Sequence, residues 1–202
     1  MTVKRNNRQA LLDATVVVVA RGGLRNLTYR AVAAEAGIAH SLVRHYFGTR
    51  EALIAAALED TLRVAIDLYE SLQTGDSVET FLNGMVSLVS ANPDSQVFQY
   101  ELMLESRRNS ELAEQIRTLY AAYLDATQVA LAKLGAAPDE ASTLLVYAAL
   151  DGLVLHLLVS DDPKATDAAL ARLRAILEHE LGGRGSQGRT AGNNLAIQKI
   201  EP

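Results

Sequence analysis

Apolar residues recur at helical spacing from the start of the chain to about residue 181, and turn residues divide this pattern into segments. In the first segment the apolar stripe consists of Leu11, Leu12, Thr15, Val18 and Val19. The β-branched run at residues 16–19 would suit a strand by itself, but its flanks keep the helical period and two glycines follow as a stop. We therefore predict a helix over residues 7–21.

Two short helices follow, with a tight turn between them. Thr28 can cap a helix that continues to Glu35, and Gly37 ends it because glycine adopts a positive φ without strain. The next helix is predicted over residues 39–46. Three helices within about 45 residues make too small a unit to bury a core of their own, so this unit must lean on the helix that follows.

That fourth helix is long, over residues 50–72, and five more are predicted over about residues 77–91, 94–107, 110–134, 139–159 and 164–181. Beyond Leu181 glycine alternates with Ser, Gln, Thr and Asn, which predicts a flexible C-terminal tail. The expected fold is all-α. Its domains are a three-helix N-terminal head (1–48) leaning on helix 49–73, a five-helix body for ligand binding and dimerisation within residues 49–182, and the tail (183–202).

The amino-acid composition limits the classes of protein to which this chain can belong. The 202 residues are 49% hydrophobic but only 5% aromatic, so aliphatic and alanine side chains must fill the core, which favours closely packed helices. Cysteine is absent, which excludes disulfides, thiol nucleophiles and thiolate metal sites. The sequence contains neither a run of about 18 uncharged apolar residues nor a signal peptide pattern. We expect a cytoplasmic protein that does not contact a membrane.

The charge is distributed unevenly. The chain carries a net charge of −5, but residues 1–50 hold eight basic and two acidic side chains, a net charge of +6, which leaves −11 on the other residues. A basic head on an acidic body suits a nucleic-acid binder that touches phosphate at one end only. From charge alone, a basic face that is merely solvated explains the pattern equally well.

The short helices supply a more specific argument. A helix, a glycine turn and a second helix with exposed N-terminal side chains form the helix-turn-helix arrangement, whose second helix enters the major groove of DNA. Small residues at Ala33 and Ala36 permit the close approach of the two helices. The side chains left facing DNA are His40, Ser41, Arg44 and His45.

Residues 27–53, LTYRAVAAEAGIAHSLVRHYFGTREAL, resemble the DNA-binding signature of the TetR family of bacterial transcriptional regulators. Residues 12–14 and Gly22 also match, so the resemblance covers about residues 8–55. A looser similarity to the helical ligand domains of the family is found at residues 102–123 and 150–153. The resemblance implies a homodimer with paired reading heads and, usually, repression relieved by a small molecule.

The resemblance also assigns roles to residues. It implies phosphate contacts for Thr28, Tyr29, Tyr46 and Arg50, and base contacts for His40 and Ser41. It places Val32, Leu42, Phe47 and Leu53 in the core. The full set expected to bind DNA is Thr28, Tyr29, Arg30, His40, Ser41, Arg44, His45, Tyr46 and Arg50.

Three positions of the third helix depart from the family pattern. Ala39 stands where the family prefers a serine cap, so a cap worth about 1 kcal/mol is missing or supplied otherwise. Ser41 stands in place of a glycine and Arg44 in place of a tyrosine. Arg44 can hold a phosphate or make a bidentate contact to guanine, and we favour the phosphate.

The histidines do not indicate a metal site. His40 and His45 are five residues apart on one helix, which is not the spacing that brings two imidazoles to one metal. His156 and His179 are isolated, and we expect them to satisfy hydrogen bonds in or near a helix interface. No metal and no cofactor are predicted.

The helix predicted over residues 139–159 is apolar nearly all round, so it must be covered on several sides. We expect one face to meet a second subunit together with the last helix; the predicted dimer interface is Leu145, Ala149, Gly152, His156, Leu173 and Leu177. The other face, with Tyr147 and Asp151, would line an interior cavity. A hydrogen bond between these two polar groups is the simpler explanation of Asp151, and a ligand contact is the alternative.

The predicted effector pocket combines residues from several helices of the body. The candidates are Met85, Val89, Phe98, Met103, Tyr120, Tyr123, Tyr147 and Asp151. Methionine and tyrosine suit a mostly apolar ligand with one or two polar atoms, although simple core packing explains each residue as well.

The sequence therefore predicts a ligand-responsive transcriptional regulator, a repressor that a small, mostly apolar molecule releases from a palindromic operator in double-stranded DNA. An enzyme is not expected, because no cysteine, carboxylate pair or Ser-His arrangement supports one. The alternative is a helical small-molecule binding protein without DNA-binding activity.

Overall fold

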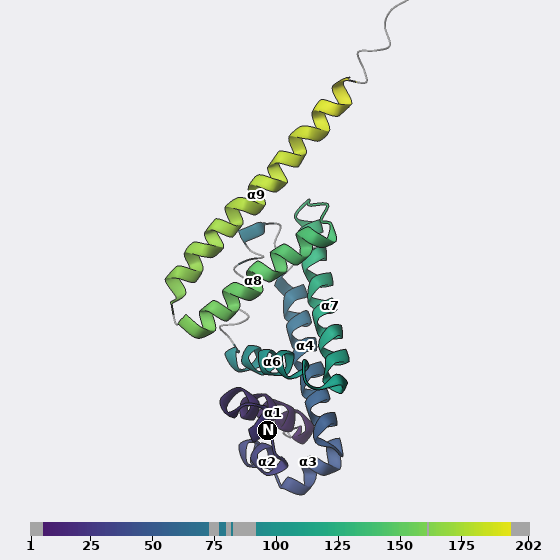
Figure 1. Cartoon of the computed structure of the whole chain (residues 1–202), viewed down its shortest axis with the longest axis vertical. Helices are drawn as coiled ribbons and strands as arrows, with labels where there is room; N and C mark the ends of the chain where they lie inside the picture. The colour runs from purple at the N-terminus through teal and green to yellow at the C-terminus, as the bar shows by residue number, and fades with distance from the viewer. Residues whose placement is uncertain (1–5, 73–76, 80–81, 83–91, 161, 195–202) are drawn as a thin grey trace, which may run out of the picture. The chain divides into compact units, whose positions relative to one another are not determined.

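The computed structural model describes residues 6–72, 77–79, 82, 92–160 and 162–194 (Figure 1). Every regular element among these residues is a helix, which confirms the predicted all-α class. The N-terminal helices are α1 (Asn7–Gly22), the single turn η1 (Leu24–Asn26), α2 (Tyr29–Ala36), α3 (His40–Phe47) and α4 (Arg50–Leu72). They are followed by α6 (Pro93–Glu105), α7 (Ser110–Lys133), α8 (Glu140–Ser160) and α9 (Pro163–Asn194).

Most predicted boundaries agree with these helices to within one or two residues. The turn η1 was not predicted. Of the helix expected over residues 77–91, Val78, Glu79 and Leu82 are helical and the rest lies outside the described residues, apart from a bend at Ser77.

The caps of α2 act as expected. Thr28 Oγ1 accepts a hydrogen bond from the backbone N–H of Ala31 at 3.1 Å. At the other end Gly37 has φ +67°, and the N–H of Ile38 donates to Ala33 at 2.9 Å, which closes the turn into α3. A residue with a Cβ would be strained at Gly37, so this glycine directs the chain from α2 into α3.

The last helix differs from the prediction. We expected it to end at Leu181, but α9 continues to Asn194. No proline occurs between Pro163 and Pro202, so every residue of this segment keeps a backbone N–H for the helical ladder; glycine lowers helix propensity without removing that donor. The expectation of flexibility for residues 183–202 stays a prediction.

The chain divides into two compact units. The first comprises Met1–Ser71 and Ser87–Tyr123, and the second comprises Leu72–Val86 and Leu124–Pro202. The predicted boundaries after residues 48 and 182 stay predictions. Val32 of α2 and Val43 of α3 belong to the same buried cluster as Phe98 and Leu102 of α6, so the head helices share their core with α6.

The core of the first unit is aliphatic, as the composition indicated. Side chains with no exposed surface come from α1, α2, α3, α4 and α6; they include Leu11 and Val19, Val32, Val43, Leu53, Phe98 and Leu102. Helix α1 packs against both α2 and α6. A hydrogen bond of 2.6 Å from Gln9 Nε2 to Asp60 Oδ2 also joins α1 to α4. Together these contacts hold α2 and α3 on a rigid base.

In the second unit α8 and α9 pack against each other. The buried side of α8 consists of Thr143, Val146, Tyr147, Leu150 and Val154. Its length and mean hydropathy of 1.8 would allow a membrane span, but a core helix of a soluble protein passes the same test.

Candidate nucleic-acid interface

Helix α3 has two chemically different sides. Val43 and Phe47, one turn apart, are buried in the core of the first unit. His40, Ser41, Arg44 and His45 are all exposed. Packing against α2 and the core therefore uses the apolar side of the helix and leaves a side rich in hydrogen-bonding groups toward solvent.

The exposed side chains gather around one hollow. A surface recess of about 520 Å³, which we call the α3 recess, is bordered by Tyr29, His40, Ser41, Arg44 and His45. The structure thus brings together five of the nine residues predicted to bind DNA. The guanidinium of Arg44, the two imidazoles and the hydroxyl of Ser41 can donate to phosphates and to base edges in a major groove.

Two residues predicted to hold phosphates have hydrogen bonds inside the head. The exposed Thr28 caps α2, as described above. Tyr29 is partly buried, and its hydroxyl donates to the carbonyl of Gly48 at 2.8 Å. Because a phenol has one proton, Tyr29 has no donor for a phosphate while this bond is formed. Both residues fix the start of α2, and their phosphate contacts stay predictions.

Arg30 and Tyr46 are exposed but do not border the α3 recess. The ring of Tyr46 makes an edge-on contact with the imidazole of His45 at a centroid distance of 5.5 Å. The DNA contacts of Arg30 and Tyr46 stay predictions.

Arg50 has a role that the resemblance did not imply. Its Nη2 donates to the carbonyl of Leu24 at 2.7 Å, and its Nε donates to the carbonyl of Leu27 at 3.2 Å. The side chain therefore joins the first turn of α4 to η1 and to the segment before α2. In the protein without DNA this guanidinium is an internal brace, and its expected phosphate contact stays a prediction.

No sequence signal pointed to this brace. The turn η1 was not predicted, and no sequence pattern shows which backbone carbonyls will accept a hydrogen bond from Arg50. The same is true of Arg8, whose guanidinium lies 5.5 Å from the centroid of the Phe47 ring and so joins the start of α1 to the end of α3. Ala39, in contrast, behaves as expected: no side chain caps the start of α3.

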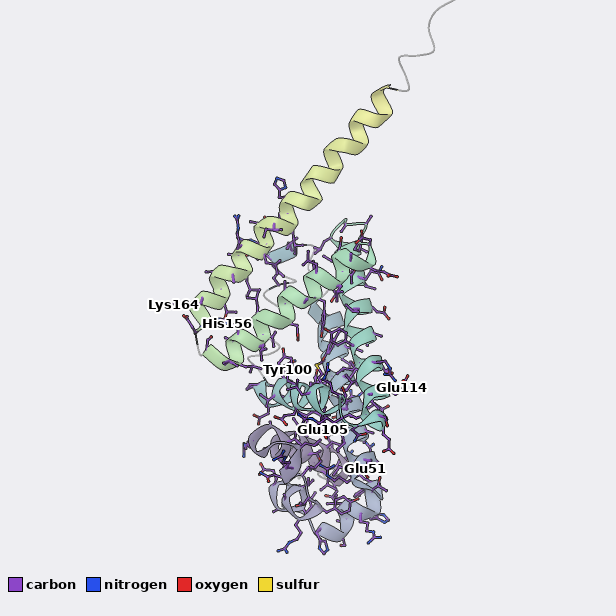
Figure 2. All side chains as sticks on the ribbon, in the orientation of Figure 1. Glu51, Tyr100, Glu105, Glu114, His156 and Lys164 are labelled. Atoms are coloured by element: carbon purple, nitrogen blue, oxygen red, sulfur yellow. The ribbon has the colours of Figure 1, made fainter. Side chains whose placement is uncertain are left out.

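The second unit exposes a different kind of surface. Large apolar side chains are uncovered on α8 and α9, and we call them the apolar face; they are Leu144, Leu145, Leu155 and Val159 of α8 and Ile176 of α9. Of the predicted dimer interface, Leu145, Gly152 and His156 are exposed, and Ala149 and Leu173 are partly buried. Figure 2 labels His156 on α8.

The single chain leaves the remaining expectations for this unit as predictions. Leu177 is buried within the unit, so it supports α9 from inside. His156 and His179 are both exposed, and their expected place in or near a helix interface stays a prediction. Leu155 and Val159 were missed, although their spacing from Leu145 and Gly152 continues one stripe along the helix.

The predicted effector pocket stays a prediction. Phe98 is fully buried in the core of the first unit, where Met103 and Tyr123 pack against the same core. The hydroxyl of Tyr123 donates to the buried Gln99 Oε1 at 2.9 Å. Tyr120 is partly buried in the first unit; Tyr147 is buried and Asp151 partly buried in the second; Met85 and Val89 lie outside the described residues.

Two sequence families match the chain. The family described as bacterial regulatory proteins, tetR family, matches residues 11–57. The family described as tetracyclin repressor-like, C-terminal domain, matches residues 74–179. The first match contains α2, α3 and the α3 recess, and the second contains α8.

Individual proteins agree with these matches. The HTH-type transcriptional regulator BetI of Brucella anthropi is 26% identical over 171 residues, which cover 80% of this chain and 87% of that protein. A transcriptional regulator from Rhodococcus sp. Rha1 has the same fold, with a TM-score of 0.72 and 22% identity over 84% of this chain and 95% of that one. A regulator from Saccharomonospora viridis, solved with choline, has a TM-score of 0.69 at 19% identity over 85% and 95% of the two chains.

Proposed function

The chain belongs to the TetR family of bacterial transcriptional regulators, and on that premise we propose that it is a homodimeric repressor that leaves a palindromic operator when a small molecule binds. As a helix-turn-helix regulator of this family it would act on DNA in the cytoplasm. Helix α3 enters the major groove, and its exposed side chains contact the operator.

The α3 recess is the observation that carries this proposal. His40, Ser41, Arg44 and His45 are not needed for packing, yet they gather at one exposed place. Residues 1–50 also carry the net charge of +6, which favours approach to phosphates. A helix that serves only to complete a core would not need this set of donors on its solvent side.

The apolar face supports the homodimer. Leu145 is 72% exposed and Val159 is 78% exposed, and both lie on a helix whose opposite side is buried. A second copy that pairs its own α8 and α9 with this face in twofold symmetry would cover these side chains. Two α3 helices about 34 Å apart would then meet successive major grooves of a palindrome.

Release by an effector requires a difference in affinity. A small molecule removes the protein from its operator only if it binds better to a form in which the two α3 helices no longer match the grooves. The choline complex of a protein with the same fold supports small-molecule binding by this architecture. Within the first unit, the apolar Phe98 and Met103 and the hydroxyl of Tyr123 fit a mostly apolar effector.

The test measures the affinity for the DNA upstream of the protein's own gene by fluorescence anisotropy at several salt concentrations. Arg44→Ala should weaken binding about 100-fold or more on every sequence, because a dimer loses two charge-assisted contacts to phosphate of about 1.5–3 kcal/mol each. His40→Ala should change the preferred sequence, since that side chain is assigned to a base edge.

Arg117→Ala is the matched control, because it removes one exposed arginine of α7 that pairs with Glu114. Its affinity for DNA should equal that of the natural protein. Equal affinities for all three variants, or no DNA binding at low salt, would instead favour a helical small-molecule binding protein.

A further inference from the structure

A second recess lies within the first unit and shares no residue with the α3 recess. It is bordered by η1, the first turns of α4 and the turn from α6 into α7, and we call it the junction cavity. Its volume is about 470 Å³, which is within the range of small-molecule sites. Figure 2 labels two residues that border it, Glu51 of α4 and Glu105 of α6.

Part of the cavity wall is apolar. Ile54 and Leu112 border the cavity and also belong to the buried core of the unit. Leu24 and Ala55 border it as well and are partly buried. An aliphatic group of a few carbons can therefore leave water by packing against the edge of the core.

The charged part of the wall is balanced. Arg25, Arg50 and Arg108 border the cavity, and so do Glu51, Glu105 and Glu111. Arg108 pairs with Glu105 at 3.7 Å, and Arg50 is bound to two backbone carbonyls. The exposed Arg25, Glu51 and Glu111 then present both signs of charge to an occupant. A ligand with a single charge would meet repulsion from one of the two sets, whereas a zwitterion finds a partner at each end.

Gln115 provides an independent observation. It borders the cavity from α7, and its Oε1 is the one buried side-chain acceptor without a hydrogen-bond partner among the described residues. A buried acceptor without a donor destabilises a protein, so native structures rarely retain one. A ligand that offers a donor to Gln115 would remove this cost.

We infer that the junction cavity binds an α-amino acid with an aliphatic side chain. The ammonium group donates to Gln115 Oε1 and faces Glu51 and Glu111, the carboxylate faces Arg25, and the aliphatic side chain packs on the apolar wall. Leu24 and Arg50 border the cavity and also form the hydrogen bond that joins η1 to α4. An occupant that packs on them therefore stabilises this connection. This site goes beyond the proposed function, since binding there requires no DNA.

The probe is L-leucine, added to the full-length protein without DNA and followed by isothermal titration calorimetry and thermal unfolding. At leucine concentrations of about ten times Kd, Tm should rise by about 3 °C. Two analogues separate the charges: 4-methylpentanoate lacks the ammonium group and 3-methylbutylamine lacks the carboxylate. Each should bind about tenfold more weakly than leucine, or worse.

Gln115→Leu should weaken leucine binding at least tenfold while the Tm of the unliganded protein stays the same or rises, because the orphan acceptor is removed. Arg25→Ala is the second variant, on an exposed side chain that the fold does not require. Glu114→Gln is the matched control: Glu114, labelled on α7 in Figure 2, does not border the cavity and pairs with Arg117, so leucine binding should be unchanged.

The absence of heat and of a Tm shift with leucine would overturn the inference, and so would tighter binding of either analogue. Leucine binding that survives both Gln115→Leu and Arg25→Ala would place the amino acid elsewhere and overturn it too. None of these results bears on the DNA affinity of Arg44→Ala, so failure of this site and failure of the proposed function are separate outcomes.

Discussion

The α3 recess and the apolar face are both exposed helix surfaces, but their chemistry is opposite. On α3 the exposed side chains are His40, Ser41, Arg44 and His45, while the apolar residues turn into the core. On α8 the helix is apolar all round, so covering one side within the unit still leaves Leu145 and Val159 in solvent.

This difference identifies two kinds of partner. A surface of imidazole, hydroxyl and guanidinium groups can replace water at phosphates and base edges, so its exposure in the free protein costs little. Burial of aliphatic surface stabilises a protein by about 25 cal/mol for each Å², so aliphatic side chains that stay in water forgo this free energy. Contiguous patches of them mark protein interfaces. The first surface therefore fits DNA and the second fits another copy of the chain.

The largest expected effect comes from giving the apolar face a charge. Leu145→Glu should convert the dimer to a monomer and lower the affinity for the operator about a hundredfold or more. Twofold pairing would bury two carboxylates, each at an effective cost of several kcal/mol. Sedimentation velocity measures the first effect and anisotropy measures the second.

Leu104→Glu provides the control for Leu145→Glu. Leu104 of α6 is 68% exposed, close to the 72% of Leu145, but it lies in the first unit. This variant should stay dimeric and bind DNA normally. If Leu145→Glu also sediments as a dimer, the apolar face is not the subunit interface.

A smaller effect is expected from the support beneath α3. Arg50→Ala should lower the free energy of unfolding by about 1–3 kcal/mol, because the carbonyls of Leu24 and Leu27 lose their donor. Urea denaturation measures this change. Arg25→Ala, which removes an exposed arginine of η1, should change it by less than about 0.5 kcal/mol.

The opposite result for Arg50→Ala would support the predicted phosphate contact. Unchanged stability, together with weaker DNA binding and a shallower dependence on salt, would mean that Arg50 leaves its carbonyl partners when DNA binds. The α3 surface would then include the first turn of α4.

The smallest effect concerns the start of α3. Ala39→Ser should raise the free energy of unfolding by about 0.5–1 kcal/mol, since a serine hydroxyl can accept from a free N–H of the first turn. Ala34→Ser, at an exposed position inside α2, should give no gain. Equal changes at the two positions would show that α3 does not lack a cap.

Much of the fold was predictable because it depends on neighbours in the sequence. The cap at Thr28, the positive φ of Gly37 and the periodic apolar stripes act over a few residues, so the helix boundaries and the two sides of α3 followed from spacing. Four residues of the α3 recess, His40, Ser41, Arg44 and His45, were predicted for the same reason: packing uses Val43 and Phe47, and the helical period leaves the others exposed. Tyr29, on α2, was expected only from the family resemblance.

Other features needed the folded chain. Spacing placed Leu177 on the interface stripe, but only packing shows that this residue faces the inside of its unit. The boundary after residue 48 was expected from the length of the head, whereas the head shares a core with α6, which lies some 50 residues farther along the chain.

By itself, the sequence determined the all-α class, the helix-turn-helix and the polar side of α3, because these depend on interactions between residues one or two turns apart. The tertiary structure decided the internal hydrogen bonds of Arg50, the wall of the junction cavity and the division into units. Arg50 and its two acceptors are 23 and 26 residues apart, and no local pattern specifies which distant carbonyls a guanidinium will meet. The packing of whole helices determines such hydrogen-bond partners, because distant segments come together only when the chain folds.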